Sequence, residues 1–282
     1  MECANPECEA GLPGHVRACL VCGRDAGFPN VRAARGIEEQ PVAQARYEAA
    51  REASADGGYE DVFRQFELAC SSAYAVICMG LSTVLYIVSS DNVLYATYYR
   101  QVDAAARIPE ENSWDRARES VDSMMFPHYH REISFGALSL TGIGHTAYGP
   151  YSIVLKEVAI RDRTSVFHEP LFPFFRSRGI VVGDAVPPGF RATWSDRGRL
   201  AAAKHGSQLT AHTDPDDFQD LLLSPGGDTE GDCIEAHVYG PIHRRAIWRV
   251  MGTAPRRRAD QILVKSLQRK LDEVGAELQL TT

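Results

Sequence analysis

Residues 224–239 read SPGGDTEGDCIEAHVY and combine a loop rich in glycine and acidic residues with a short strand pattern. From Cys233 onward polar and apolar residues alternate, which is the period of a β-strand. Glu235 and His237 are two residues apart and therefore lie on one face of the expected strand. An inward carboxylate costs free energy unless it is paired or used in chemistry. The segment predicts a functional pair or, as the alternative, a sheet face that meets solvent.

The same half of the chain carries further strand and helix patterns. Residues 132–140 (EISFGALSL) alternate, residues 151–158 (YSIVLKEV) form a second strand candidate, and residues 164–167 and 180–182 are shorter candidates. The helical patterns are 195–205, 214–223, 241–250 and 259–274. The last of these helices places its apolar residues on one face, at Ile262, Leu263, Leu267, Leu271 and Val274. We expect a mixed, mainly antiparallel sheet with flanking helices over residues 126–282.

Residues 37–125 have a mostly helical composition. The helical patterns in this part are 37–55, 59–70, 84–88, 93–107 and 114–125. Between them, residues 73–79 are apolar and partly β-branched, so they could form a buried strand. The expected fold class is α+β, with one domain over residues 37–282 that has a helical part (37–125) and a sheet-containing part (126–282).

Four of the seven cysteines lie near the start of the chain, at Cys3, Cys8, Cys19 and Cys22. The spacing C-x4-C-x10-C-x2-C lets two close pairs fold back so that four thiolates converge in a tetrahedron. A segment this short buries little apolar surface, and metal binding supplies its folding free energy, on the order of 10 kcal/mol. We expect residues 1–30 to form a zinc ribbon, with four reduced cysteines and no metal as the alternative. Four protein ligands leave no position for a catalytic water, so the expected zinc is structural.

The overall composition sets broad limits on function. The chain has 282 residues, of which 44% are apolar, and a formal net charge of -7. This balance is ordinary for a globular protein and is not that of a generally basic nucleic-acid binder. The first residues lack the pattern of a secretory signal, and the longest apolar stretch, 73–88, is shorter than the roughly 18 residues that span a bilayer. We expect a cytoplasmic protein with no membrane partner, and the odd cysteine count argues against a disulfide framework.

Two more polar clusters each end a loop and begin an expected strand. Residues 129–131 (YHR) precede the first strand candidate, and residues 145–151 (HTAYGPY) lead into the second. Together with Glu235 these clusters could line one cleft at an edge of the sheet. For each histidine alone a structural or surface role is commoner, and the tyrosines more often pack than stack on a cofactor.

In this order the three segments resemble the mono-ADP-ribosyltransferase pattern over about residues 125–250. That family has Arg or His near the first strand, a hydroxyl or Tyr at the second, and a loop that runs into a strand with a catalytic Glu. The matching positions are Arg131 with Ser134, Tyr148 with Tyr151, and Gly226 to Glu235. One position departs from the pattern, because the family usually has Gln or Glu two residues before its catalytic Glu and this chain has Cys233 there.

The resemblance implies NAD-dependent ADP-ribosyl transfer, or NAD cleavage, on an unknown target. It implies that Glu235 and His237 are catalytic and that NAD is bound by Arg131, Ser134, Tyr148 and Tyr151. Cleavage of the nicotinamide–ribose bond passes through an oxocarbenium-like state that a nearby carboxylate stabilises. An arginine fork suits the pyrophosphate of NAD. The sequence lacks Rossmann, P-loop, zincin and G-x-S-x-G motifs, which disfavours those enzyme classes.

The alternative function is a non-catalytic adaptor, in which the zinc ribbon and its surroundings bind nucleic acid or a protein partner. Basic residues gather toward the C-terminus, at Arg244, Arg245, Arg249, Arg256, Arg257, Arg258, Lys265, Arg269 and Lys270. Such a run is usually a solvated helix face, but it could bind phosphates. An enzyme should consume NAD through Glu235. A nucleic-acid adaptor should bind RNA or DNA with an affinity that falls steeply with salt, and replacing Glu235 should not change that affinity.

Overall fold

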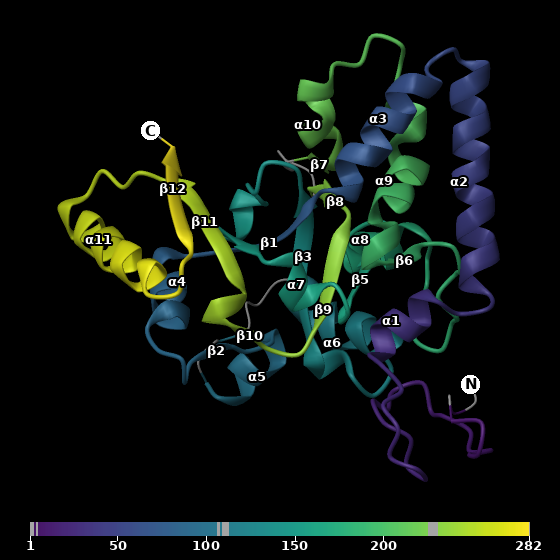
Figure 1. The fold of residues 1–282 in the computed structure, drawn as a ribbon, viewed down its shortest axis with the longest axis horizontal. Helices are drawn as coiled ribbons and strands as arrows, with labels where there is room; N and C mark the ends of the chain where they lie inside the picture. The colour runs from purple at the N-terminus through teal and green to yellow at the C-terminus, as the bar shows by residue number, and fades with distance from the viewer. Residues whose placement is uncertain (1–2, 4, 106–107, 109–112, 225–230, 282) are drawn as a thin grey trace.

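The computed structural model describes residues 3, 5–105, 108, 113–224 and 231–281, without the side chains of 113–116. In this part of the chain the main sheet has eight strands in the order β12-β11-β4-β1-β3-β9-β5-β6 (Figure 1). Neighbouring strands are antiparallel except for the parallel pair of β11 and β12. The strands are β1 (Tyr74–Met79), β3 (Ile133–Ser139), β4 (Tyr151–Leu155), β5 (Thr164–Phe167), β6 (Arg191–Thr193), β9 (Glu235–Tyr239), β11 (Ile247–Thr253) and β12 (Glu277–Thr281).

Two short ribbons and a set of helices complete the described fold. β10 (Ile242–His243) pairs with β2 (Leu94–Tyr95), and β7 (Leu223–Ser224) pairs with β8 (Asp232–Cys233). The helices are α1 (Pro29–Ala34), α2 (Glu39–Asp56), α3 (Glu60–Ser71), α4 (Leu81–Val88), α5 (Tyr98–Asp103), α6 (Ser113–Met125), α7 (Glu157–Ile160), α8 (Leu171–Ser177), α9 (Arg197–His205), α10 (Phe218–Leu222) and α11 (Arg258–Asp272). The mixed α+β class predicted from the sequence is confirmed.

The larger core lies between one face of the sheet and helices α3, α9, α4 and α11. Phe63 and Phe66 of α3 are fully buried there, as are Leu267 and Leu271 of α11. Their sheet partners include Ile77, at the middle of the order of strands. Fully burying side chains of this size stabilises a fold by roughly 1.5–3 kcal/mol each, so this face supplies much of the stability.

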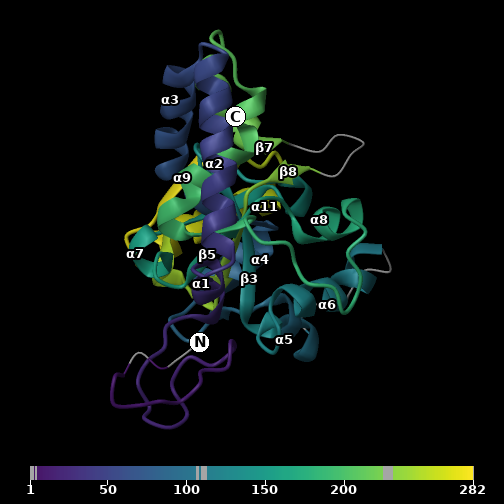
Figure 2. The same cartoon turned by 90° about the vertical axis from the view of Figure 1, so that its right-hand side faces the viewer.

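The second face of the sheet carries a smaller aromatic core. Phe126, just after α6, and Phe174 of α8 pack there against Ile133 of β3 and Phe167 of β5. In Figure 2 helices α6 and α8 lie on the other side of the strands from α3 and α9. Helices on both faces explain why the central strands carry few exposed residues on either side.

Several predicted elements differ from the structure. Residues 241–250 are not a helix, because Ile242–His243 and the alternating segment Ile247–Thr253 form strands β10 and β11. Residues 180–182 are not a strand, and Val181 and Val182 are exposed in a turn where the Asp184 side chain accepts a hydrogen bond from the Val181 amide. Within 93–107 the described helix is only α5. Residues 37–125, which are mostly helical, also contain the central strand β1, and the apolar, partly β-branched residues 73–79 predicted this strand.

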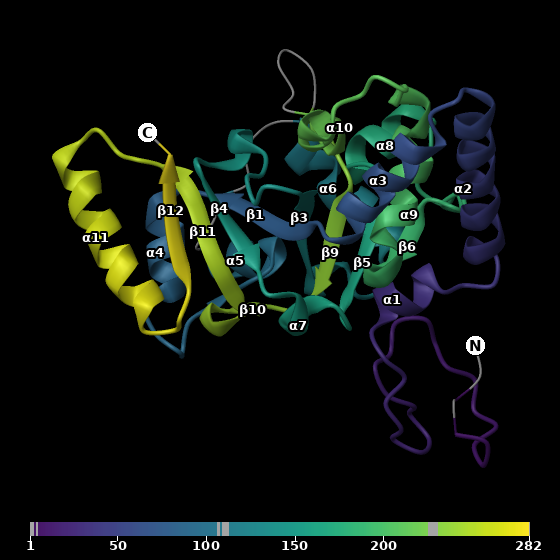
Figure 3. The same cartoon turned by 45° about the horizontal axis from the view of Figure 1, so that its top comes forward.

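The N-terminal residues form a small lobe that projects from the body beside α1 (Figures 1 and 3). An isolated bridge pairs Ala18 with Asp25, and Gly23 between them has φ of 72°, a conformation that glycine adopts without strain. The segment after this lobe contains the buried helix α1. None of the helices in the described residues is long and apolar enough to cross a membrane.

Candidate functional site

The four N-terminal cysteines converge as their spacing predicts. Their Sγ atoms all lie within 4.8 Å of one another, with Cys3 and Cys22 at 3.5 Å and Cys8 and Cys19 at 3.7 Å. A tetrahedral ion with metal–sulfur bonds of about 2.3 Å requires sulfur–sulfur distances of about 3.8 Å. The donor set therefore fits one metal ion with four thiolate ligands.

Backbone amides around this cluster favour the thiolate form that a metal needs. The amide of Arg24 lowers the pKa of Cys22 to about 6. The amides of Cys22 and Val21 likewise lower the pKa of Cys19. These donors belong to the tight turn around Gly23 and act on Cys19 and Cys22 only, whereas desolvation and neighbouring thiols raise the pKa of Cys3 and of Cys8.

The pair singled out in the sequence lies on β9. Glu235 Oε2 and His237 Nε2 are 2.9 Å apart, and both side chains face the aromatic core. The Glu235 side chain is 16% exposed and that of His237 is 1% exposed. The alternative of an open, solvated sheet face therefore does not apply to this pair. Because a carboxylate can only accept, the contact places the imidazole proton on Nε2.

Aromatic rings enclose His237. Its ring centroid lies 4.8 Å from that of Phe126, 5.4 Å from Phe135 and 6.1 Å from Phe167. Among the described residues Nδ1 of His237 has no hydrogen-bond partner. The imidazole is thus held by packing on three sides and by one polar contact, and that contact orients the Glu235 carboxylate.

A second carboxyl group approaches this pair from α6. Arg118, Asp122 and Phe126 follow one another at a spacing of four, so they lie on one face of the helix toward the sheet. Asp122 is buried and accepts a hydrogen bond from the Tyr99 hydroxyl at 2.9 Å, and Arg118 Nη1 lies 4.0 Å from its carboxylate. Burial raises the pKa of Asp122 to about 7, and the negative charge of Glu235 acts in the same direction.

Two arginine–aromatic contacts border this acidic cluster. The Arg118 guanidinium lies 4.4 Å from the Tyr98 ring centroid, and the Arg131 guanidinium lies 5.3 Å from that of Tyr99. Arg131 also forms an ion pair with Asp103. Arg131 thus reaches the cluster through Tyr99, which bonds to Asp122.

The other residues matched to NAD binding lie elsewhere. Ser134 is buried and its hydroxyl donates to the carbonyl of Gly240, while Tyr151 is buried with its hydroxyl 3.4 Å from the carbonyl of Thr253. Side chains switch face at each successive residue of a strand. Ser134 and Tyr151 each lie an odd number of residues from the position of their own strand that is level with Glu235, so both point to the opposite face of the sheet. Tyr148 is exposed, with its ring 6.0 Å from that of His145. The structure therefore brings Glu235 and His237 together, but does not bring Ser134 or Tyr151 to them.

Sequence reasoning missed Asp122, Tyr99 and Arg118. An aspartate within a helical pattern ordinarily faces solvent, and nothing local distinguishes Asp122 from its neighbours. The available signal was its spacing of four from Phe126, which puts it on the buried stripe of α6. The predicted loop from Gly226 toward Glu235 lies largely outside the described residues.

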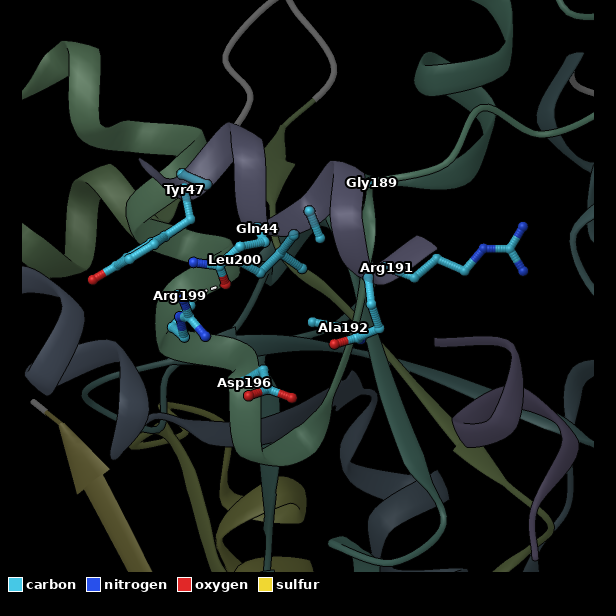
Figure 4. Close-up of a pocket in the computed structure, with 11 residues that line it drawn as sticks. Gln44, Tyr47, Gly189, Arg191, Ala192, Asp196, Arg199 and Leu200 are labelled. Carbon is cyan, nitrogen blue, oxygen red and sulfur yellow. Dashed lines mark hydrogen bonds between the residues drawn. The ribbon is translucent and has the colours of Figure 1, made fainter. Parts of the chain in front are cut away.

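A shallow pocket on the helical side of the molecule contains none of these residues (Figure 4). Its walls come from α2, β6 and α9, and include Tyr47, Asp196 and Arg199. Arg199 Nη2 donates to Gln44 Oε1 at 2.6 Å, and both residues line the pocket. The Arg191 side chain points away from it in Figure 4.

Comparisons with known proteins add little to this geometry. No family model matches the chain, and no curated relative matches it. Among solved structures, DarT of Thermus sp. 2.9 in complex with carba-NAD+ is similar at a TM-score of 0.36 and 9% identity, over 74% of this chain and 95% of that one. A likeness at this level does not establish a shared fold or function.

Proposed function

We propose that this protein cleaves the nicotinamide–ribose bond of NAD and transfers the ADP-ribosyl group, with Glu235 as the catalytic carboxylate. The observation that carries the proposal is the contact between Glu235 Oε2 and His237 Nε2 at 2.9 Å. A partly exposed carboxylate oriented by a buried imidazole, in an otherwise aromatic wall, has the properties of an electrostatic stabiliser held in place before substrate arrives.

The reaction needs one well-placed negative charge. The C–N bond between nicotinamide and ribose breaks, and its electron pair leaves with neutral nicotinamide. The positive charge that develops on the ribose is stabilised by the Glu235 carboxylate, as in glycoside cleavage. An acceptor nucleophile or water then forms the new bond to the ribose carbon and releases a proton.

Neighbouring groups support binding of an anionic, aromatic dinucleotide. Arg118 supplies a cation whose planar fork suits a phosphate, and Tyr98 and Phe135 supply rings beside it. Arg131 remains a proposed ligand that acts from the far side of Tyr99. Ser134 and Tyr151 are not part of the proposed NAD site, because they lie on the other face of the sheet from Glu235.

Transfer to an acceptor can be tested with labelled NAD and a broad lysate. Wild-type protein should label at least one acceptor, and Glu235→Gln should lose label at least 10²-fold, as removal of an electrostatic stabiliser does elsewhere. Glu277→Gln is the matched control, because Glu277 is an exposed carboxylate at the edge of the sheet. Equal labelling by wild type and Glu235→Gln would contradict the proposal.

We further propose that the four cysteines bind zinc and that this zinc is structural. Four thiolates in a tetrahedron are a ligand set typical of structural zinc. All four positions are protein ligands, so the ion would stabilise the lobe without taking part in the reaction.

The alternative of a non-catalytic adaptor is favoured by one observation on the same lobe. Leu20 and Val21, between two of the cysteines, are 79% and 77% exposed. Exposed apolar pairs suit a protein partner better than nucleic acid. Several basic C-terminal residues also engage acids, since Arg244 and Arg245 both bond to Asp91. An adaptor would retain its function in Glu235→Gln and lose it when Leu20 and Val21 are both changed to Ser.

A further inference from the structure

Helix α1 inserts one side chain into the sheet beside the candidate site. Asn30 is 1% exposed, and its Nδ2 lies 2.9 Å from the carbonyl oxygen of His237. The same nitrogen lies 3.1 Å from the carbonyl of Arg163 and 3.2 Å from Ser165 Oγ. A buried amide that donates to two neighbouring strands fixes their backbone positions, because losing it leaves buried acceptors without this donor.

The other side of α1 is fastened to the cysteine lobe. Arg32 Nη1 donates to the carbonyls of Ala26 and Gly27 at 3.1 and 2.9 Å. Its Nη2 donates to the carbonyls of Pro13 and Gly14 at 3.4 and 2.9 Å. One guanidinium therefore binds two loops, the first between Cys8 and Cys19 and the second just after Cys22.

An aromatic contact reinforces this attachment. The Phe28 ring, just before α1, lies 5.4 Å from that of Tyr239 at the end of β9. The guanidinium of Arg17, from within the lobe, covers the same ring at 3.8 Å. The lobe thus contacts β9 by a second route that does not include Asn30.

The loops that Arg32 binds take their shape from the four cysteines. A metal-bound lobe of this size loses its fold without the ion, since metal binding supplies its folding free energy. Loss of the ion would therefore remove the carbonyls that hold Arg32, which is one of the attachments of α1 beside its own buried residues Val31 and Ala34. Figure 3 shows α1 between the lobe and the ends of β5 and β9.

We propose that Asn30 is a positioning residue that couples the four-cysteine centre to the Glu235–His237 pair. Loss of the metal, or of the Asn30 amide, loosens β9 at His237 while the far side of the sheet stays folded. The catalytic consequence rests on the proposed function, whereas the coupling itself is a property of the fold and has its own measurement.

Amide hydrogen exchange measures this coupling without reference to activity. In the metal-loaded full chain, amides of residues 235–239 should exchange slowly. Asn30→Ala, Arg32→Ala and Cys22→Ser should each raise that exchange rate about tenfold or more, and residues 277–281 of β12 should keep their wild-type rate. Asn92→Ala, at an exposed asparagine, is the matched control and should change neither segment.

Metal return separates coupling from general damage. Chelation of wild-type protein should raise exchange in β9, and added zinc should restore it. In Asn30→Ala, zinc should still bind but should not restore slow exchange. Unchanged β9 exchange in Cys22→Ser and in chelated wild type would overturn the proposal. An equal rise in β9 and β12 would also overturn it, since that marks a loss of overall stability.

The same samples distinguish this inference from the proposed function. If β9 responds to the metal while wild-type protein never consumes NAD, the coupling stands and the proposed function fails. If wild-type protein consumes NAD, and Cys22→Ser and Asn30→Ala consume it at the same rate with unaltered β9 exchange, the proposed function stands and the coupling fails.

Discussion

The Asp122 carboxylate and the Tyr99 hydroxyl lie 2.9 Å apart beneath α6, next to the strand that carries Glu235 and His237. This hydrogen bond holds a second buried carboxyl group near Glu235, and the charge of Glu235 adds to the effect of burial on its pKa. The candidate site is therefore a cluster of two acids, an imidazole and a tyrosine rather than one isolated carboxylate.

Asp122→Asn should make the protein more stable at high pH. The pKa of Asp122 rises from 3.8 to about 7 on folding, so its ionised form destabilises the folded state. This penalty is absent below pH 4, grows as the pH rises from 4 to 7, and is complete above 7. Asparagine keeps the acceptor for Tyr99 and lacks the charge, so the variant should gain on the order of 2–4 kcal/mol over wild type at pH 8.

Denaturant unfolding at pH 4 and pH 8 checks this expectation. The difference in free energy of unfolding between Asp122→Asn and wild type should be near zero at pH 4 and favour the variant at pH 8. A difference that does not change with pH would show that Asp122 ionises in the folded protein as it does in the unfolded chain.

Purified protein should contain one zinc ion per chain. Cys19→Ser or Cys22→Ser should lose the metal, because three thiolates do not complete the tetrahedron. Cys70→Ala should retain it, since Cys70 is buried in α3 away from the cluster. Elemental analysis of protein prepared without chelator gives the ratio, and a value near zero would exclude the zinc centre.

Leu267→Ala should cost roughly 2–5 kcal/mol of unfolding free energy, because it removes a fully buried side chain from the main core. Ile262→Ala on the same helix is the control, since Ile262 is 61% exposed and should cost less than about 0.5 kcal/mol. Equal, small losses at both positions, measured by chemical denaturation, would mean that α11 does not dock as described.

The fold could be predicted where one local period dominates. The alternation in residues 235–239 placed Glu235 and His237 on one face, and the spacing of Leu267 and Leu271 identified the buried stripe of α11. Ile262, assigned to that same stripe, is exposed because at about 100° per residue it lies roughly 140° around the helix from Leu267 and roughly 180° from Leu271. The cysteine spacing was similarly sufficient, since four ligands within 22 residues have few ways to converge.

The site could be predicted only in part, because register and helix docking are set by distant contacts. The sequence alone did not reveal that Ser134 pairs with Val238, which puts Ser134 on the face opposite Glu235. The prediction of a helix over residues 241–250 is wrong because Pro241 is typical of a helix start, whereas pairing of Ile247–Thr253 with β4 and β12 decides for a strand. Asp122 belongs to the site because α6 packs on the face of the sheet that carries Glu235, and the sequence alone does not predict this contact between distant segments.

Release of nicotinamide from NAD by purified protein tests the central claim most directly. Wild-type protein and Glu277→Gln, matched for zinc content and fold, should release nicotinamide at the same rate. Glu235→Gln should release it at least 10²-fold more slowly, because the charge that stabilises the oxocarbenium-like state is gone. Nicotinamide release that is absent from wild type, or equal in wild type and Glu235→Gln, would contradict the assignment of Glu235 as the catalytic carboxylate.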